Sequence, residues 1–265
     1  MIDDGGTPDV ASFVQIDRVD TDLGARTSPE ISTRSPTLPL LVVPIGSCEQ
    51  HGPHLPLDTD TRIAVALSEA LAASLMDPCS IQGRRGTASV QRGDVVVAPP
   101  LGVTASGEHA GFAGTLSIGT EVMADVLVEL VRSADWADAV VLVNGHGGNA
   151  SAVGRAVARS TADGRRVLAW WPRIVGADAH AGHTETSLLL AIAPQVVRVD
   201  RAEVGRREHV TELIDELRRD GVRAVSPNGV LGDPTAATAS YGHSLLALLV
   251  GDLVATVDAW WTPQP

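Results

Sequence analysis

Lysine is absent from this chain, so every basic side chain belongs to arginine. The 20 basic residues are outnumbered by 32 acidic ones, and the formal net charge is −12 at pH 7. Nucleic acids and anionic membranes attract proteins through basic patches that neutralise phosphate. The acidic balance therefore argues against nucleic acid or membrane as the main partner.

Cysteines, aromatic residues and long apolar runs are also scarce. The two cysteines, Cys48 and Cys79, are too few for a disulfide framework. Aromatic residues make up 3% of the chain, so we expect a core of alanine, valine and leucine. We find no run of about 18 apolar residues that would suggest a membrane span, and the start, MIDDGG, lacks the features of a signal peptide. A cytoplasmic location is the simplest expectation.

Two regions are predicted from the pattern along the chain. Residues 1–37 are polar and form a predicted N-terminal arm, either mobile or ordered against a neighbouring subunit. Residues 38–265 form one domain in which apolar strands alternate with amphipathic helices, which is typical of an α/β fold with a mostly parallel sheet covered on both sides. The predicted strands cover 39–46, 94–102, 138–145 and 165–171, and the predicted helices cover 61–75, 121–134, 149–164, 183–194 and 239–261.

Polar motifs follow each predicted strand, at 46–60, 102–115, 144–149 and 178–187. In parallel α/β sheets, ligands bind outside the carboxyl ends of the strands. Because these ends share one edge of the sheet, we expect the four loops to converge on a single site.

The first motif, GSCEQHGPHLPLDTD, contains three candidate metal ligands. Glu49 and His51 are two residues apart, and in an extended chain such side chains share a face. Asp60 lies beside the start of the next helix. It could cap that helix, but Asp58 or Thr59 could do so instead and leave Asp60 free to bind an ion.

The third motif, VNGHGGN, places His146 between glycines at the end of a strand. Glycines let backbone approach an ion or ligand closely. A phosphate-binding loop is a weaker interpretation, because neither a Walker lysine nor a complete G-x-G-x-x-G is present. A structural histidine is the other alternative.

The remaining two motifs add histidines and carboxylates. DAHAGHTETS supplies His180, His183 and Glu185; Glu185 is either a favourable first-turn acid or a ligand that closes a second metal site, with one histidine as proton shuttle. SGEHAGFAGT supplies Glu108 and His109, interpreted as either a solvated turn or a substrate contact.

Five of these side chains form a candidate ligand set without thiolate: Glu49, His51, Asp60, His146 and Glu185. A structural zinc site is usually closed with cysteine. Nitrogen and oxygen ligands spread over separate loops suit a two-metal hydrolytic centre, in which a water acidified to a pKa of about 7 can attack an amide.

Taken in order, GSCEQHGPHLPLDTD, SGEHAGFAGT, NGHGGN and HAGHTETS resemble the creatininase family of metal-dependent amidohydrolases over about residues 39–250. The resemblance implies a three-layer α/β/α fold, a binuclear metal centre and a homo-oligomer, often a hexamer. It also assigns roles: Glu49, His51, Asp60 and His146 match metal ligands, with Asp60 as the bridge, and His180 matches the catalytic acid/base.

One position departs from the family pattern. Creatinine-hydrolysing members carry a glutamate for the second metal where this chain has Gly148. The departure argues against creatinine as substrate and favours Glu185 as the replacement ligand.

The wording PIGSCEQHGPHLPLDTDTRIA and NGVLGDPTAATA resembles a branch of the family that cleaves a short ribosomally made precursor peptide. That branch releases a modified C-terminal Val-Tyr dipeptide during assembly of a redox cofactor. We predict this activity with two divalent ions, Zn or Fe(II), with Mn as an alternative, and with His180 as catalytic residue. Glu108, His109 and His183 are candidate substrate contacts. The competing hypotheses are hydrolysis of a small cyclic amide or formamide, a non-catalytic metal-binding subunit, and a nucleotide-binding module.

Overall fold

A computed structural model describes residues 21–33, 38–76 and 94–261. Its sheet has four strands in the order β2–β1–β3–β4, and every neighbouring pair is parallel. The strands are β1 (Leu40–Ile45), β2 (Val95–Val97), β3 (Ala139–Asn144) and β4 (Val167–Trp170). The prediction of a mostly parallel central sheet is confirmed.

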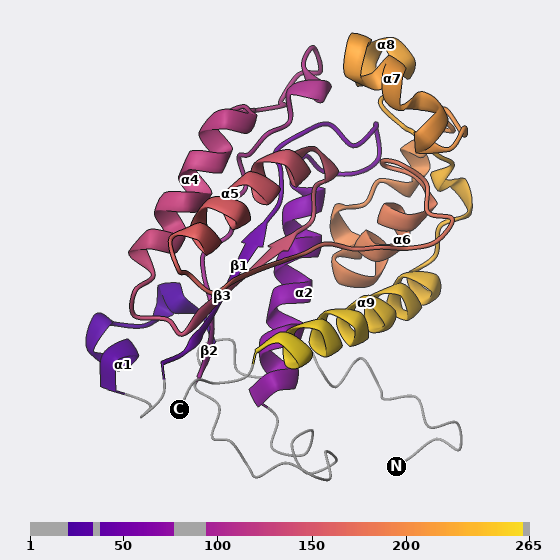
Figure 1. The fold of residues 1–265 in the computed structure, drawn as a ribbon. Helices are drawn as coiled ribbons and strands as arrows, with labels where there is room; N and C mark the ends of the chain where they lie inside the picture. The colour runs from indigo at the N-terminus through magenta and orange to yellow at the C-terminus, as the bar shows by residue number, and fades with distance from the viewer. Residues whose placement is uncertain (1–20, 34–37, 77–93, 262–265) are drawn as a thin grey trace, which may run out of the picture.

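Helices cover both faces of the sheet, which gives the three layers seen in Figure 1. In β1, Leu40 and Val42 pack into one apolar cluster, while Leu41, Val43 and Ile45 pack into the other. Side chains alternate in this way because successive residues of a strand point to opposite faces. The first cluster is covered by α2 (Thr59–Met76), α6 (His183–Ile192) and α9 (Ala239–Trp260), and the second by α4 (Thr120–Ser133) and α5 (Ala150–Ala162).

Several shorter elements differ from the prediction. The strand expected at 94–102 is only Val95–Val97, because Pro99 and Pro100 follow and cannot donate to a sheet. Among the helices of the described residues, three were not predicted: α1 (Ser28–Thr33), α7 (Val210–Asp220) and α8 (Val222–Val225). The 3-10 helices in the same ranges are η3 (Leu23–Ala25), η4 (Gly107–His109), η5 (Gly147–Asn149), η6 (Pro194–Val196), η7 (Val199–Arg201) and η8 (Pro234–Ala236).

Part of the predicted N-terminal arm lies against the same chain. The amide of Val97 donates to the carbonyl of Thr21 at 2.7 Å, which extends the β2 edge. Leu23 and Ile31 pack against the cluster under α4 and α5. Residues 1–20 and 34–37 of the arm, and Cys79, lie outside the described residues.

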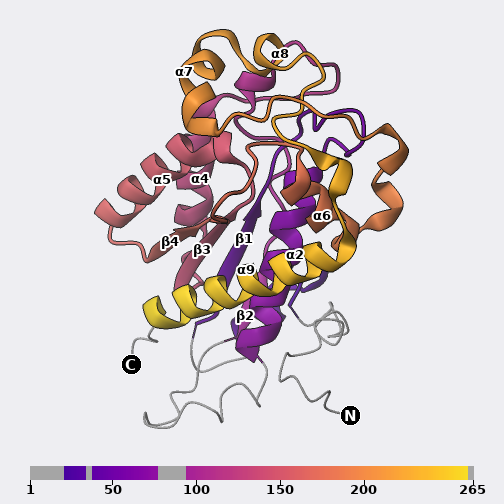
Figure 2. The same cartoon turned by 90° about the vertical axis from the view of Figure 1, so that its right-hand side faces the viewer.

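Helix α9 is the one helix in the described ranges that is long and apolar enough to cross a membrane by length and composition. One face of it belongs to the core against α2 and α6, with Leu249, Leu253 and Val257 at most 1% exposed. A core helix of a globular domain passes the same test. Figure 2 shows α9 lying across the outside of this layer, and its outward face includes Leu248, which is 58% exposed.

Candidate metal centre

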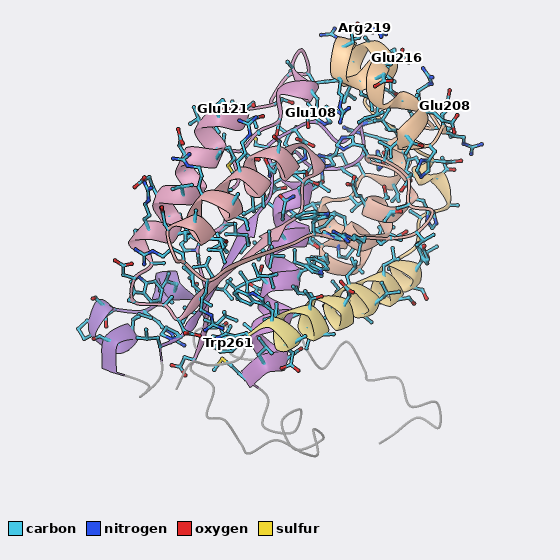
Figure 3. The ribbon with its side chains drawn as sticks, viewed as in Figure 1. Glu108, Glu121, Glu208, Glu216, Arg219 and Trp261 are labelled. Atoms are coloured by element: carbon cyan, nitrogen blue, oxygen red, sulfur yellow. The ribbon has the colours of Figure 1, made fainter. Side chains whose placement is uncertain are left out.

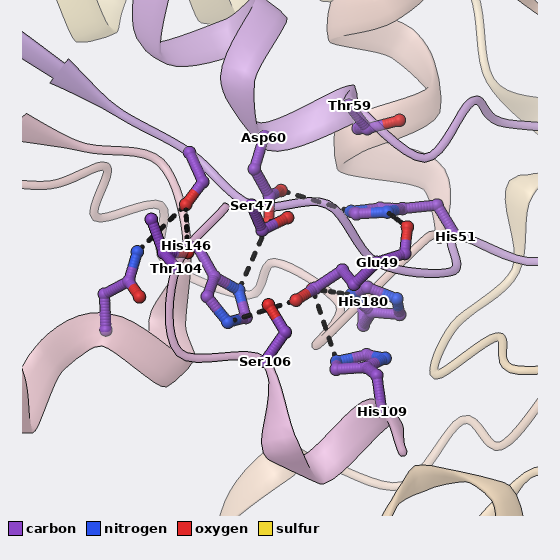
Figure 4. Close-up of polar contacts among 12 residues, drawn as sticks. Ser47, Glu49, His51, Thr59, Asp60, Thr104, Ser106, His109, His146 and His180 are labelled. Carbon is purple, nitrogen blue, oxygen red and sulfur yellow. Dashed lines mark hydrogen bonds and ion pairs between the residues drawn. The ribbon is translucent and has the colours of Figure 1, made fainter. Parts of the chain in front are cut away.

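The loops that follow the four strands meet at the carboxyl edge of the sheet, as the order of the motifs predicts. They bring together five buried histidine and glutamate side chains, drawn in Figure 4: Glu49, His51, His109, His146 and His180. The ring of His180 lies 4.3 Å from that of His51 and 4.5 Å from that of His109, centroid to centroid. Segments far apart in the sequence thus form one polar cluster.

Asp60 joins two of these histidines. It lies in the first turn of α2 and is 2% exposed. Its Oδ1 lies 3.1 Å from Nε2 of His51, and its Oδ2 lies 3.2 Å from Nδ1 of His146. The hydroxyl of Ser47 donates to Oδ2 at 2.8 Å. Each carboxylate oxygen of Asp60 therefore faces a different imidazole (Figure 4).

The carboxylate of Glu49 lies at the centre of the cluster, where it contacts only imidazole nitrogens. Its Oε2 is 3.1 Å from Nε2 of His146, and its Oε1 is 3.3 Å from Nε2 of His109 and 3.9 Å from Nδ1 of His180. Both oxygens are buried and neither accepts a hydrogen bond. A buried carboxylate is costly unless it is hydrogen-bonded, paired or bound to a cation. A buried carboxylate whose only close contacts are imidazole nitrogens, without a well-directed hydrogen bond, fits a site where carboxylate and histidines share a metal ion.

Two further carboxylates flank the histidines on opposite sides. Oε2 of Glu185 lies 3.9 Å from Nε2 of His51 and accepts a hydrogen bond from the amide of Ala181 at 2.6 Å. Oε1 of Glu108 lies 3.2 Å from Nε2 of His146. The cluster thus has a His51 side and a His146 side, and Asp60 spans both.

Backbone carbonyls orient two of the imidazoles. Nδ1 of His51 donates to the carbonyl of Glu49 at 3.0 Å, which leaves Nε2 facing Asp60. Nε2 of His180 donates to the carbonyl of Gln50 at 2.8 Å, which leaves Nδ1 facing Glu49. Outer hydrogen bonds of this kind fix the tautomer of a metal-binding histidine. Both rings therefore direct their second nitrogen into the cluster.

The charges in the cluster shift its pKa values strongly. Burial alone would lower the pKa of His51, but the carboxylates of Asp60, Glu185 and Glu49 raise it to about 10. Burial opposes ionisation of Asp60, yet His51 and His146 hold its pKa well below the usual range. Burial and the neighbouring His51 lower the pKa of His180 to about 4. Without an ion, the protein therefore holds a proton on His51 at neutral pH.

This protonation predicts that Zn²⁺ binding releases protons. His51 and His146 both have raised pKa values, and each must become neutral to bind an ion. Burial also raises the pKa of the proposed ligand Glu185 to about 7, so it too releases part of a proton. We expect release of about two to three protons per chain at pH 7, and tighter binding as the pH rises. Calorimetric titration in buffers of different ionisation enthalpy measures the number released. Zn²⁺ binding with no buffer-dependent heat would contradict this interpretation.

Glycines and an asparagine hold the loops close enough for these contacts. A Cβ on Gly145 would lie 2.5 Å from the carbonyl oxygen of Asp60, so only glycine lets β3 approach the start of α2. The side chain of Asn149 accepts from the amide of Ala105 at 3.1 Å and donates to the carbonyl of Gly46 at 3.0 Å. Asn149 was not singled out from the sequence, although it closes the NGHGGN motif.

The segment NGVLGDPTAATA, for which a surface turn was the alternative interpretation, positions the His180 loop. Leu231 donates its amide to the carbonyl of His180 at 2.8 Å and accepts from the amide of Ala179 at 3.0 Å. Nε2 of Gln50 donates to the carbonyl of Gly229 at 3.1 Å. Ala181, which follows His180, is the one non-glycine residue of the described chain with positive φ, at 52°. Such strain persists where surrounding contacts enforce it and often marks functional sites.

Not every conspicuous histidine or acid faces the cluster. His183 lies with its ring 4.8 Å from that of Tyr241 and donates to the carbonyl of Ala236 at 3.1 Å. Asp58 pairs with Arg62 at 2.8 Å on the surface. His109, in contrast, is 3% exposed inside the cluster. The roles of His109 and His183 in substrate binding stay predictions.

The donor atoms have spacings that suit shared ions. Two ligands at about 2.1 Å from a tetrahedral ion lie about 3.4 Å apart, close to the 3.1 Å and 3.2 Å contacts of Asp60 with His51 and His146. Nitrogen and oxygen donors with a carboxylate between them fit a pair of divalent ions. A parallel α/β/α sheet with a candidate two-metal cluster at its carboxyl edge is the arrangement expected of a metal-dependent α/β hydrolase.

Comparisons with known proteins place the chain within that class. The sequence profile of Creatininase, creatinine amidohydrolase, matches residues 25–257. The chain belongs to the creatininase family, and it is a hydrolytic enzyme that acts on amide bonds.

Individual relatives differ in their sequence identity to this chain. The mycofactocin precursor peptide peptidase of Mycobacterium ulcerans (strain Agy99) is 49% identical over 92% of this chain and 93% of its own. Creatinine amidohydrolase of Pseudomonas putida is 25% identical over 84% and 90%. A solved mutant creatininase of Zn–Zn type has a TM-score of 0.70 at 21% identity, covering 91% of this chain and 98% of its own. The solved structure supports the three-layer fold.

Proposed function

We propose that this enzyme is a metal-dependent peptidase that cleaves the mycofactocin precursor peptide and releases its modified C-terminal Val-Tyr dipeptide. The observation that carries the proposal is the 49% identity to the peptidase of M. ulcerans over 92% of the chain. The cluster supports it, because a buried carboxylate among oriented histidines suits amide hydrolysis assisted by metal ions.

Each group of the cluster has a place in this chemistry. Five residues would hold two divalent ions: Glu49, His51, Asp60, His146 and Glu185. Such ions, when bound, polarise an amide carbonyl and acidify water. His180, held by the carbonyl of Gln50, accepts a proton at Nδ1 and passes it to the leaving amine. Zn or Fe(II) is the proposed metal, with Mn as the alternative, and elemental analysis of the purified protein distinguishes them.

A cavity beside the cluster offers a place for an apolar side chain of the peptide. Its volume is about 200 Å³, and His146 and Glu185 lie in its wall. The rest of the wall is mainly apolar and includes Ile63, Trp171, Ile174 and Leu188. A peptide whose scissile bond lies at the ions would place a neighbouring side chain in this cavity.

Replacing Trp171 by alanine is expected to raise KM for the peptide about 10-fold and to change kcat less. Removing an apolar group from a substrate pocket weakens binding by about 1–3 kcal/mol. Steady-state kinetics on a synthetic precursor peptide measures both constants. Val175→Ala is the matched control, since Val175 lies in the same loop and is fully exposed. An unchanged KM in Trp171→Ala would place the peptide elsewhere.

The function itself is tested by supplying three amides to the metal-loaded protein: the modified precursor peptide, creatinine and a formamido-pyrimidine. Mass spectrometry should show a dipeptide released from the peptide and little change in the small amides. Chelation should stop the cleavage, and added Zn²⁺ or Fe²⁺ should restore it. Hydrolysis of a small amide alone would support the alternative substrate class, and bound metal without any hydrolysis would support a non-catalytic metal-binding subunit.

A homo-oligomer in the cytoplasm is part of the same proposal. The outward face of α9 exposes Leu248 and Tyr241, which are 58% and 40% exposed, and apolar surface on a helix favours a subunit contact. The cytoplasm is where a ribosomally made peptide first becomes available. Light scattering of the purified protein measures the subunit count, for which a hexamer is expected from the family resemblance.

A further inference from the structure

Gly148 leaves a space that the carboxylate of Glu108 fills. A Cβ built on Gly148 would overlap Oε1 of Glu108 and Nε2 of His146, and it would lie 2.8 Å from the carbonyl oxygen of Ala105. A larger residue at this position must therefore displace a side chain or the backbone. The carboxylate of Glu108 has access to His146 because residue 148 has no side chain.

Glu108 reaches this space from a different loop. It lies in η4 (Gly107–His109), after β2, and its side chain is 33% exposed. Its Oε1 lies 3.2 Å from Nε2 of His146, and the same nitrogen lies 3.1 Å from Oε2 of Glu49. Donor atoms of these three residues all lie within 4.8 Å of one another. Two carboxylates from separate loops thus converge on one imidazole edge.

The surroundings of the Glu49 carboxylate, which contacts only imidazole nitrogens, indicate what this convergence binds. Glu49 is fully buried, and neither of its oxygens accepts a hydrogen bond. Both Glu49 and Glu108 contact Nε2 of His146, so two carboxylates lie close together beside one imidazole. A divalent cation shared by both carboxylates would neutralise them and satisfy the buried oxygens of Glu49.

We infer that Glu108 is a metal ligand on the His146 side of the cluster, and that Gly148 is required because any side chain there would exclude it. The inference rests on the metal-dependent function proposed above. Four carboxylates then surround the ions, and their four negative charges balance two divalent cations: Glu49, Asp60, Glu108 and Glu185.

Glu185 does not replace Glu108 in this arrangement. Its Oε2 lies on the His51 side and is hydrogen-bonded to the amide of Ala181. The two glutamates therefore serve different ions, and removing one should leave the other ion in place. Glu108 is thereby assigned to the metal centre, where the sequence predicted a substrate contact.

The test is a Zn²⁺ titration of the metal-free protein without peptide, in competition with a chromophoric chelator. In Glu108→Gln, the affinity for one of the two ions should fall at least about 100-fold. Mutating a residue that only hydrogen-bonds a ligand already lowers metal affinity about 10- to 100-fold. The second ion should bind as before. The visible absorption spectrum of the Co²⁺-loaded protein should change. Glu108→Asp keeps the charge and should lose less affinity.

Glu121→Gln is the matched control. Glu121 is an exposed residue of α4 that pairs with Arg155, and Figure 3 shows it on an element apart from Glu108. Its replacement should leave affinity, stoichiometry and the Co²⁺ spectrum unchanged.

The inference is overturned if Glu108→Gln binds two ions with wild-type affinity and spectrum. A rise in KM for peptide in that variant would then identify Glu108 as a substrate contact. If metal-free Glu108→Gln has a lower melting temperature than wild type, the Zn²⁺ affinity of Glu108→Asp is the deciding measurement. A wild-type affinity for both ions in Glu108→Asp would also show that Glu108 is not a ligand. A wild-type protein that binds two Zn²⁺ and cleaves no peptide would refute the proposed function and leave this inference standing.

Discussion

Replacing Asp60 by alanine is expected to remove both metal ions and to lower kcat/KM by at least about 1000-fold. The two oxygens of Asp60 face His51 and His146, at 3.1 Å and 3.2 Å. No other carboxylate of the described chain contacts both of these imidazoles through different oxygens. Metal ions contribute several kcal/mol to amide hydrolysis, and each 1.4 kcal/mol of barrier is about tenfold in rate.

Elemental analysis of the purified variant measures the ions, and peptide cleavage measures the rate. Asp58→Asn is the matched control, because Asp58 lies two residues earlier and pairs only with Arg62 on the surface. Melting temperatures of the metal-free proteins separate loss of ions from loss of fold. An Asp60→Ala protein with two ions and full turnover would refute the bridging role.

Replacing His180 by glutamine is expected to lower kcat about 100- to 10,000-fold while both ions remain bound. A positioned acid or base contributes a factor of this size. His180 faces the cluster through Nδ1, while the carbonyl of Gln50 holds its Nε2. A fixed ring with one nitrogen directed into the cluster suits proton transfer, and the metal content of the variant separates this role from coordination.

The discriminating measurement is metal content together with the pH dependence of kcat. The variant should retain two ions, and its kcat should no longer show the pH dependence that the ionisation of His180 causes in the wild type. His209→Asn serves as the control, since His209 is an exposed cap of α7 and asparagine also caps helices well. Loss of an ion in His180→Gln would show that His180 is a ligand.

The sequence predicts the sheet and much of the cluster because both depend on local patterns. Apolar strands separated by helices impose parallel pairing, and this pairing puts the ends of β1 and β3 at one edge. Glu49 and His51 share a face because they are two residues apart, and His146 follows β3 directly. These relations need only the regular geometry of strands.

The remaining features depend on contacts between loops. The residues next to Glu108 in the sequence do not show whether it is solvated or lies beside His146. Its position depends on the space left by Gly148, which belongs to another loop. The role of Asn149 likewise depends on Ala105 and Gly46. Helix α7 was missed for a different reason: Leu213 is its one buried residue, so its polar composition resembles a loop.

The proposed ligands Asp60, His146 and Glu185 lie in three separate segments of the chain, so a bound metal would also act as a sensor of folding. In an unfolded chain these groups are far apart, and no binding site of this kind exists. Ions that bind only the native state stabilise it by an amount that grows with their concentration. Metal supply in the cell would then set the amount of folded enzyme as well as its activity, and scarcity would expose the sheet edge where the loops now meet.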